Sequence, residues 1–320
     1  MAVTAPSAAR STARRVLVLR ALGLGDLLTA VPALRALRRG MPGARVTLAA
    51  PAALAPLALG TGAVDEVLPQ DGLAPLPAFG PVDEAVNLHG RGPQSHRLLA
   101  ALAPGRLLAF AHTGALHTDG PDWDPDEHEV HRWCRLVSAY GFDADPDDLD
   151  LAVPAVASPA PGAVVVHPGA AFPARRWPAE RFAAVAAALR DGGERVVVTG
   201  GAAEAPIARR VVDLAGLDAG ADLSGRTGLP QLAALVAGAR LVVCGDTGLA
   251  HLATAYRTPS VLLFGPTPPA RWGPPDRAQH RVLWAGRRGD PHGPEPHRGL
   301  LEISADQAVE AAGRALHPTF

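Results

Sequence analysis

Residues 241–255 read Leu-Val-Val-Cys-Gly-Asp-Thr-Gly-Leu-Ala-His-Leu-Ala-Thr-Ala. The apolar run 241–244 predicts a buried strand, and Gly245 ends it. The apolar residues at 249, 252 and 253 follow at helical spacing and predict a helix. The side-chain oxygens of Asp246 and Thr247 can cap its N-terminus. The stretch therefore predicts a strand, a tight turn and a helix. Such a turn lies where open α/β sheets bind ligands, and the helix N-terminus suits phosphate. The alternative is an ordinary turn in which Asp246 only caps the helix.

The composition is that of a folded protein without a strong charge. Of 320 residues, 48% are hydrophobic and 19% charged, and the net charge of -1 argues against a nucleic-acid-binding protein with a broad basic face. All 30 basic residues are arginine, which excludes a P-loop lysine and a Schiff-base lysine. The two cysteines, Cys134 and Cys244, predict no disulfide framework and favour a reducing cytoplasm. No apolar run reaches the length of a membrane span.

The first strand of the chain also leads into a glycine-rich turn. Residues 16–20 predict a strand, and Gly23, Gly25 and Asp26 follow before a helical pattern of leucines. The glycines allow the backbone to turn tightly and to approach a ligand closely. A dinucleotide-binding fingerprint would need a third glycine where the chain has Leu28, so a dehydrogenase is disfavoured. Asp26 has two interpretations, a helix cap or a functional carboxylate.

Strands and helices alternate along the rest of the chain, which predicts parallel sheets. Further strands are predicted at 46–49, 64–68, 84–88, 107–110, 164–166, 195–199 and 260–264. Further helices are predicted at 94–103, 126–140, 179–190, 204–215, 230–238 and 304–316. Residues 285–299 are expected to be a polar, solvated loop without a metal.

The pattern divides the chain into parts. Residues 143–162 are rich in Asp, Ala and Pro, which is typical of an interdomain linker. We expect a disordered leader at 1–13, an N-terminal domain at 14–150 and a C-terminal domain at 151–303. The last segment, 304–320, is expected to form a helix.

Six short motifs occur together in one order. They are Leu-Gly-Leu-Gly-Asp at 22–26, Asn-Leu-His-Gly at 87–90, His-Pro-Gly-Ala at 167–170 with Arg-Arg-Trp-Pro at 175–178, Ser-Gly at 224–225, Gly-Asp-Thr-Gly-Leu-Ala-His at 245–251 and Phe-Gly-Pro-Thr at 264–267. Between about residues 16 and 272 the chain thus resembles glycosyltransferase family 9, the ADP-heptose:lipopolysaccharide heptosyltransferases. The resemblance implies an α/β fold of GT-B architecture, with two Rossmann-like domains facing a central cleft. It also implies that the last helix packs back toward the N-terminal domain.

The resemblance implies roles for residues in most of these motifs. Asp26 would be the catalytic base, and Arg175 would contact the donor diphosphate at a place where the family often has lysine. An arginine fork suits a phosphate, although its geometry differs from that of an ammonium group. The other donor-binding residues would be Gly169, Ser224, Gly225, Asp246, Thr247, Gly248, Leu249 and His251. The acceptor-side loops would carry Gly23, Gly25, Asn87 and His89.

The implied reaction is an inverting, metal-independent transfer of a sugar from a nucleotide donor. The donor would be ADP-linked, most simply ADP-heptose, and the acceptor a glycan or a glycolipid resembling the lipopolysaccharide core. No cofactor, metal or nucleic acid is expected, and membrane contact would be peripheral at most, at the inner face of the membrane. Two alternatives remain: a GT-B transferase or epimerase that uses another nucleotide sugar, and a non-catalytic nucleotide-sugar-binding protein.

Overall fold

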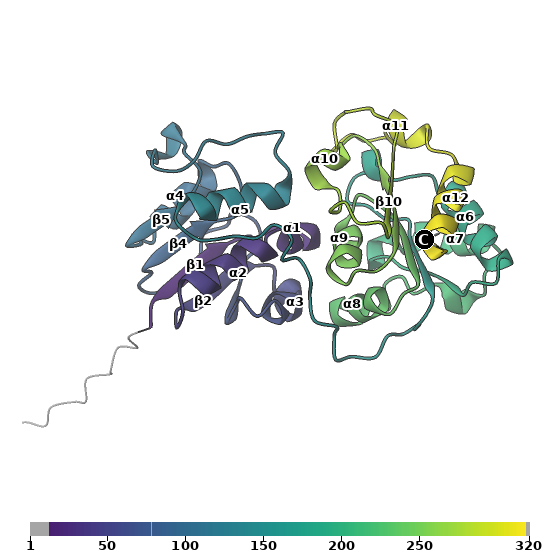
Figure 1. Ribbon diagram of the computed structural model, residues 1–320, viewed down its shortest axis with the longest axis horizontal. Helices are drawn as coiled ribbons and strands as arrows, with labels where there is room; N and C mark the ends of the chain where they lie inside the picture. The colour runs from purple at the N-terminus through teal and green to yellow at the C-terminus, as the bar shows by residue number, and fades with distance from the viewer. Residues whose placement is uncertain (1–12, 78, 318–320) are drawn as a thin grey trace, which may run out of the picture.

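Two parallel β-sheets lie side by side in the computed structural model, which describes residues 13–77 and 79–317 (Figure 1). Residues 1–12 of the expected leader lie outside the described residues. Within the described ranges, no helix combines the length and apolar character needed to cross a membrane.

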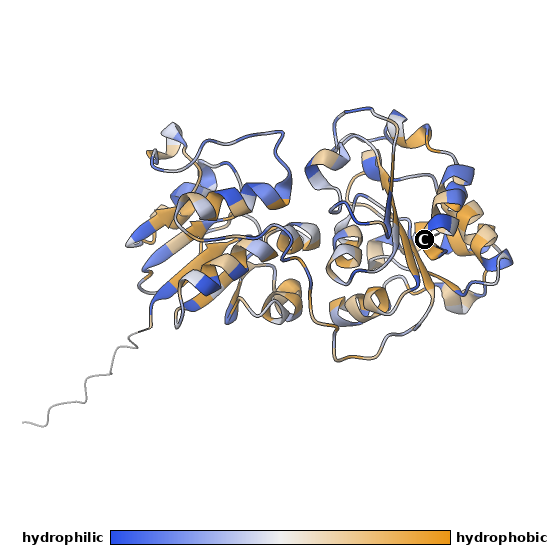
Figure 2. Cartoon of the chain, viewed as in Figure 1, coloured by the Kyte–Doolittle hydropathy of each residue, from blue (hydrophilic) through white to orange (hydrophobic). Residues whose placement is uncertain are grey.

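The first sheet has the strand order β3-β2-β1-β4-β5, and every strand pair is parallel. Its strands are β1 (Arg15–Leu19), β2 (Arg45–Ala50), β3 (Glu66–Pro69), β4 (Glu84–Asn87) and β5 (Arg106–Leu108). Val16 and Val18 join one apolar core, while Leu17 and Leu19 join another on the opposite face. Burial on both faces explains why β1 is a continuous apolar run in the sequence (Figure 2).

The second sheet has the order β10-β9-β8-β6-β7 and is also entirely parallel. Its strands are β6 (Val164–His167), β7 (Val196–Val198), β8 (Leu241–Gly245), β9 (Ser260–Phe264) and β10 (His280–Trp284). Strand β10 is missing from the sequence-based prediction. Charged Arg281 and partly exposed side chains interrupt its apolar pattern, because β10 forms the sheet edge.

Helices cover both sheets and connect their strands. They are α1 (Leu24–Thr29), α2 (Val31–Gly40), α3 (Ala55–Gly60), α4 (Gln94–Ala100), α5 (Glu129–Ala139), α6 (Ala179–Asp191), α7 (Ala205–Leu214), α8 (Leu229–Ala237), α9 (Gly248–Ala255), α10 (Pro269–Trp272), α11 (Arg298–Leu301) and α12 (Ala305–Leu316). The single helix expected after Asp26 is divided at Ala30, and Pro32 lies in the first turn of the second part. The two sheets with their helices confirm the predicted α/β fold.

The expected packing of the last helix is wrong. Helix α12 packs against α6 and against strands β8, β9 and β10, on the side of the molecule far from the first sheet (Figure 1). Its buried face consists of alanines that join the core of the second sheet; they are Ala308, Ala311, Ala312 and Ala315. These small side chains let the helix approach α6 closely, so its apolar face is already covered within the second half.

The connectivity places two switch points opposite one another. In the first sheet the chain order reverses between β1 and β4, and in the second it reverses between β6 and β8. Open α/β sheets bind ligands beyond the carboxyl ends of the strands at such points. The loops after β1, β6 and β8 are therefore the places to look for a site.

Candidate active site

A cleft of about 750 Å³ lies between the two halves, at the carboxyl ends of β1, β6 and β8. The first half contributes the turn 23–26, which includes Asp26. The second half contributes the loops that follow its strands, including Arg175 and the turn 246–249. The sequence-predicted residues that line the cleft are Gly23, Gly25, Asp26, Arg175, Asp246, Thr247, Gly248, Leu249 and His251.

Glycines bring the two halves together at the contact between α1 and α9. A Cβ atom on Gly25 would lie 2.8 Å from Cδ2 of His251, and one on Gly248 would lie 2.9 Å from Cβ of Leu24. Real Cβ atoms do not approach so closely, so both positions favour glycine. The beginnings of the two helices therefore lie side by side at the cleft.

Asp26 projects from the first turn of α1, and 28% of its side chain is exposed. Its Oδ2 accepts a hydrogen bond from the Gly23 N–H at 3.1 Å, and its Oδ1 lies 3.5 Å from Nη2 of Arg20. Burial raises the pKa of the Asp26 carboxyl above its ordinary value, although the Arg20 guanidinium opposes this. The carboxylate is thus more basic than one in water, which suits a group that accepts a proton.

Asp246 approaches the same cleft from the second half and is 7% exposed. Burial raises the pKa of its carboxyl to about 6; the Arg175 guanidinium lowers this pKa and the charge of Asp26 raises it further. The two carboxyl groups thus influence each other electrostatically across the cleft.

Three buried polar atoms in the lining have no hydrogen-bond partner among the described residues: Nε of Arg175, Nε of Arg271 and Oγ1 of Thr247. Buried donors are normally satisfied, so unpaired ones at a cleft indicate where a ligand binds. Thr247 is also the N-cap of α9, where backbone N–H groups and the helix dipole favour an anion. This side of the cleft therefore suits a phosphate-bearing ligand.

His251 is partly buried on α9 beside Trp272, with the two ring centroids 5.8 Å apart in an edge-to-face arrangement. Burial and the nearby His128 lower the pKa of His251 to about 4. The imidazole is therefore neutral at pH 7, able to donate or accept a hydrogen bond but not to supply a positive charge.

Three of the predicted donor-binding residues lie behind the cleft lining: Gly169, Ser224 and Gly225. A Cβ on Gly169 would lie 2.1 Å from Oε1 of Glu204, which does line the cleft. Ser224 is buried and its hydroxyl bonds to Asp222, while Gly225 has φ +65° and donates its N–H to the carbonyl of Gly200. These residues support the cleft wall in this structure, and their contact with a nucleoside stays a prediction.

The turn after β4 also lies outside the cleft lining. Asn87 is fully buried; its amide donates to Oγ of Ser95 at 2.9 Å, and its Oδ1 accepts the His89 N–H at 3.1 Å. Asn87 therefore fixes the turn, and its predicted place on the acceptor side stays a prediction. His89 is partly buried, and burial together with Arg20 lowers its pKa to about 4.

Sequence reasoning missed two groups of residues near the site. Arg271 and Trp272 line the cleft from α10, just after the recognised Phe-Gly-Pro-Thr motif, so an extension of that motif would have found them. Arg20 and Glu129 lie beside Asp26, and an arginine at the end of an apolar strand was a usable signal for the first of them. Glu129 comes from a distant helix, and nothing local in the sequence connects it to Asp26.

Among the described residues, no group of three or more His, Cys, Asp or Glu side chains could hold a metal ion. The expectation of metal-independent chemistry stays a prediction. A solved neighbour with a TM-score of 0.62 and 15% identity is titled an iron-containing dodecameric glycosyltransferase.

The fold and the cleft between two Rossmann-like halves define the GT-B class of glycosyltransferase architecture. A glycosyltransferase family 9 structure from Veillonella parvula matches with a TM-score of 0.79 at 22% identity, over 95% of this chain and 97% of that one. An E. coli heptosyltransferase determined with ADP matches with a TM-score of 0.70 at 21% identity, over 94% and 99% of the two chains. Likeness at this level of identity establishes the fold.

The family follows from the sequence. The sequence model of glycosyltransferase family 9 (heptosyltransferase) matches residues 117–293, more than half of the chain, and the protein belongs to this family. Lipooligosaccharide heptosyltransferase 2 of Haemophilus influenzae is 34% identical over 160 residues, which are 47% of this chain and 46% of that protein. The chain thus spans about half the length of the first curated relatives it matches.

Proposed function

We propose that the protein is an inverting heptosyltransferase that moves heptose from ADP-heptose to a hydroxyl group of a glycan acceptor. The observation that carries this proposal is the placement of a basic carboxylate, Asp26, opposite the unpartnered polar groups of Arg175 and Thr247 in one cleft. Family membership supports the reaction class. The related E. coli enzyme determined with ADP supports the choice of nucleotide.

The proposed step is a single displacement at the anomeric carbon of the donor sugar. The acceptor oxygen forms the new bond to that carbon, and the bond from the carbon to the diphosphate oxygen breaks. The proton of the acceptor hydroxyl passes to Asp26, and the electron pair of the broken bond leaves with ADP. A positioned general base typically contributes about 10²–10⁴ in rate.

The departing ADP gains negative charge, which the second half is suited to stabilise. Arg175 has an unpartnered Nε, and the beginning of α9 offers N–H groups aimed at the cleft. Charge-assisted hydrogen bonds from such groups are about twice as strong as neutral ones. Their proposed role is to stabilise the leaving group, as an oxyanion hole does for other reactions.

The two halves have separate proposed tasks. Residues 14–150 hold the acceptor beside Asp26, and residues 151–303 hold the nucleotide sugar. A lipopolysaccharide-core acceptor is supported by the names of the curated relatives. Cys134 and Cys244 are both buried and unpaired, which supports the proposed cytoplasmic location. Membrane contact is proposed to be peripheral at most, at the inner face.

A donor screen followed by product analysis tests the function. Thermal shift with ADP-, GDP- and UDP-sugars should select the ADP-linked donor. Incubation of ADP-heptose with heptose-free lipopolysaccharide should then release ADP and add one heptose, also with EDTA present. Selection of a GDP- or UDP-sugar would favour another GT-B transferase. ADP-heptose converted without an acceptor would favour an epimerase, and binding without turnover a non-catalytic protein.

A further inference from the structure

The guanidinium of Arg20 holds the turn that carries Asp26. Its side chain is fully buried. Its Nε donates to the backbone carbonyl of Asp26 at 2.8 Å, and its Nη2 donates to Oγ1 of Thr29 and to Oε1 of Glu129, each at 3.1 Å. Its Nη1 donates to the carbonyl of Leu88, at the end of β4. One buried side chain thus joins β1, the beginning of α1, the end of β4 and α5.

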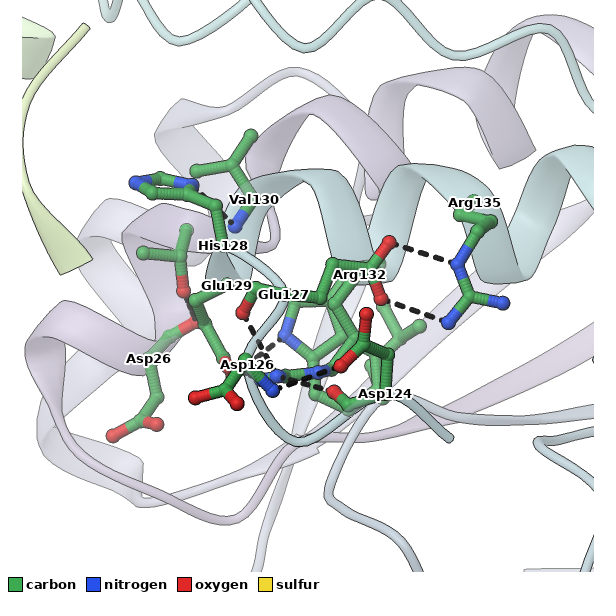
Figure 3. Close-up of polar contacts among 12 residues, drawn as sticks. Asp26, Asp124, Asp126, Glu127, His128, Glu129, Val130, Arg132 and Arg135 are labelled. Carbon is green, nitrogen blue, oxygen red and sulfur yellow. Dashed lines mark hydrogen bonds and ion pairs between the residues drawn. The ribbon is translucent and has the colours of Figure 1, made fainter. Parts of the chain in front are cut away.

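Glu129 is the second member of this network, and it lies next to Asp26 in Figure 3. It is the first residue of α5, and 7% of its side chain is exposed. Besides Arg20, its Oε1 accepts from Nε1 of Trp133 at 2.8 Å, and its Oε2 accepts from Arg132. Arg132 is itself anchored by its hydrogen bond to the Asp124 carbonyl at 2.9 Å. The orientation of Glu129 is therefore fixed from several sides.

The charges of this network balance only when Asp26 is ionised. Arg20 and Arg132 carry two positive charges, and Glu129 and Asp26 carry two negative ones. The Arg20 Nη2 lies 3.5 Å from Oδ1 of Asp26, close enough for attraction but longer than a good hydrogen bond. Arg20 therefore faces Oδ1 of the carboxylate without a good hydrogen bond to it, while the Gly23 N–H binds Oδ2.

We propose that Arg20 and Glu129 are positioning residues for Asp26: Arg20 fixes the carboxylate at the cleft, and Glu129 offsets the charge of Arg20 so that Asp26 can still accept a proton. This proposal rests on the proposed function for its catalytic meaning. The predicted effect on the proton affinity of the Asp26 carboxyl concerns the protein alone and needs no substrate. A carboxylate beside an uncompensated arginine would be a weak base, because the positive charge favours its ionised form.

Other titratable groups also face Asp26 and are part of its environment. From α5 this is Glu129; from the second half Asp246 and His251 line the same cleft. Burial and His128 lower the pKa of His251 to about 4, so His251 carries no charge that could substitute for Arg20 at neutral pH. The charge of Asp26 raises the pKa of Asp246, and Asp246 stays unchanged in the variants below.

The test is a titration of the Asp26 carboxyl by ¹³C NMR in protein labelled at aspartate, with the signal assigned by its loss in Asp26→Asn. Glu129→Gln removes the negative charge with little change of shape, and the Asp26 midpoint should fall by about one pH unit. Arg20→Gln removes the positive charge, and the midpoint should rise by a similar amount. Glu127→Gln is the matched control, because Glu127 pairs with Arg135 at 2.8 Å on the side of α5 away from Asp26 (Figure 3).

Opposite shifts in the two variants, with no shift in the control, would support the proposal. A midpoint in Glu129→Gln equal to that of the control would overturn it, as would shifts in the same direction. If one variant does not fold, as judged by circular dichroism, the direction found in the other decides. In the transfer assay, the acidic limb of the kcat/KM profile should move with the NMR midpoint. Because the titration needs no substrate, shifted midpoints without transfer would refute the proposed function and leave the positioning role standing.

Discussion

Replacing Asp246 by asparagine tests whether the buried, ionised carboxylate of Asp246 lowers the free energy of unfolding. Asp246 is 7% exposed, and none of the described residues donates a hydrogen bond to its carboxylate. Burial, opposed by Arg175, raises its pKa from 3.8 to about 6. Since each unit corresponds to about 1.36 kcal/mol, the ionised group lowers the free energy of unfolding by about 3 kcal/mol at neutral pH.

The pH dependence gives this prediction its sign. The pKa of Asp246 is higher in the folded state than in the unfolded state, so the folded state binds more protons between about pH 4 and pH 6. The stability that this group contributes is fully present below its pKa in the unfolded state, and it is lost as the pH rises through about 6, the pKa in the folded state. Asparagine cannot ionise, so Asp246→Asn should be about 3 kcal/mol more stable than wild type at pH 7.5 and nearly equal at about pH 4.

Urea unfolding of both proteins at the two pH values measures this difference. Asp65→Asn serves as a control of opposite sign. Burial raises the pKa of Asp65, but the Arg38 hydrogen bond and the Val46 N–H outweigh it and hold that pKa below its ordinary value. This variant should therefore lose stability at pH 7.5 and not at low pH. A stability difference for Asp246→Asn that does not change with pH would refute the reasoning.

Three further predictions concern the cleft. Arg175→Ala should weaken ADP binding by roughly ten- to a hundredfold in calorimetry, because hydrogen bonds to charged groups contribute about 1.5–3 kcal/mol; unchanged affinity in the folded variant would remove Arg175 from the donor site. Asp26→Asn should keep the melting temperature and ADP affinity near wild type while kcat falls at least about a hundredfold; turnover within a few-fold of wild type would make Asp26 a helix cap. Gly25→Ala should destabilise the protein by about 1–3 kcal/mol in urea unfolding, because its Cβ would lie 2.8 Å from the ring of His251; wild-type stability would contradict the close contact of α1 and α9.

Local patterns in the sequence were sufficient for much of the fold. The apolar run of β1 and the glycines before Asp26 predicted a strand and a turn at their true places, because parallel strands are buried on both faces and tight turns need glycine. Strand β10 was missed because an edge strand lacks that continuous pattern. The last helix was predicted at its true place, but its packing was inferred from the family resemblance and is wrong; its alanine-rich face indicates burial without indicating the neighbour.

The sequence by itself determined the local setting of Asp26 and Asp246, since each lies in a short motif that follows a strand. Only the tertiary structure decided how these residues act on one another. It places Asp246 within electrostatic reach of Asp26, and it buries Arg20 against Glu129, which lies 109 positions further along the chain. The physical reason is that proton affinity depends on burial and on charges a few ångströms away. Neither the burial nor those neighbours can be read from residues adjacent in the sequence.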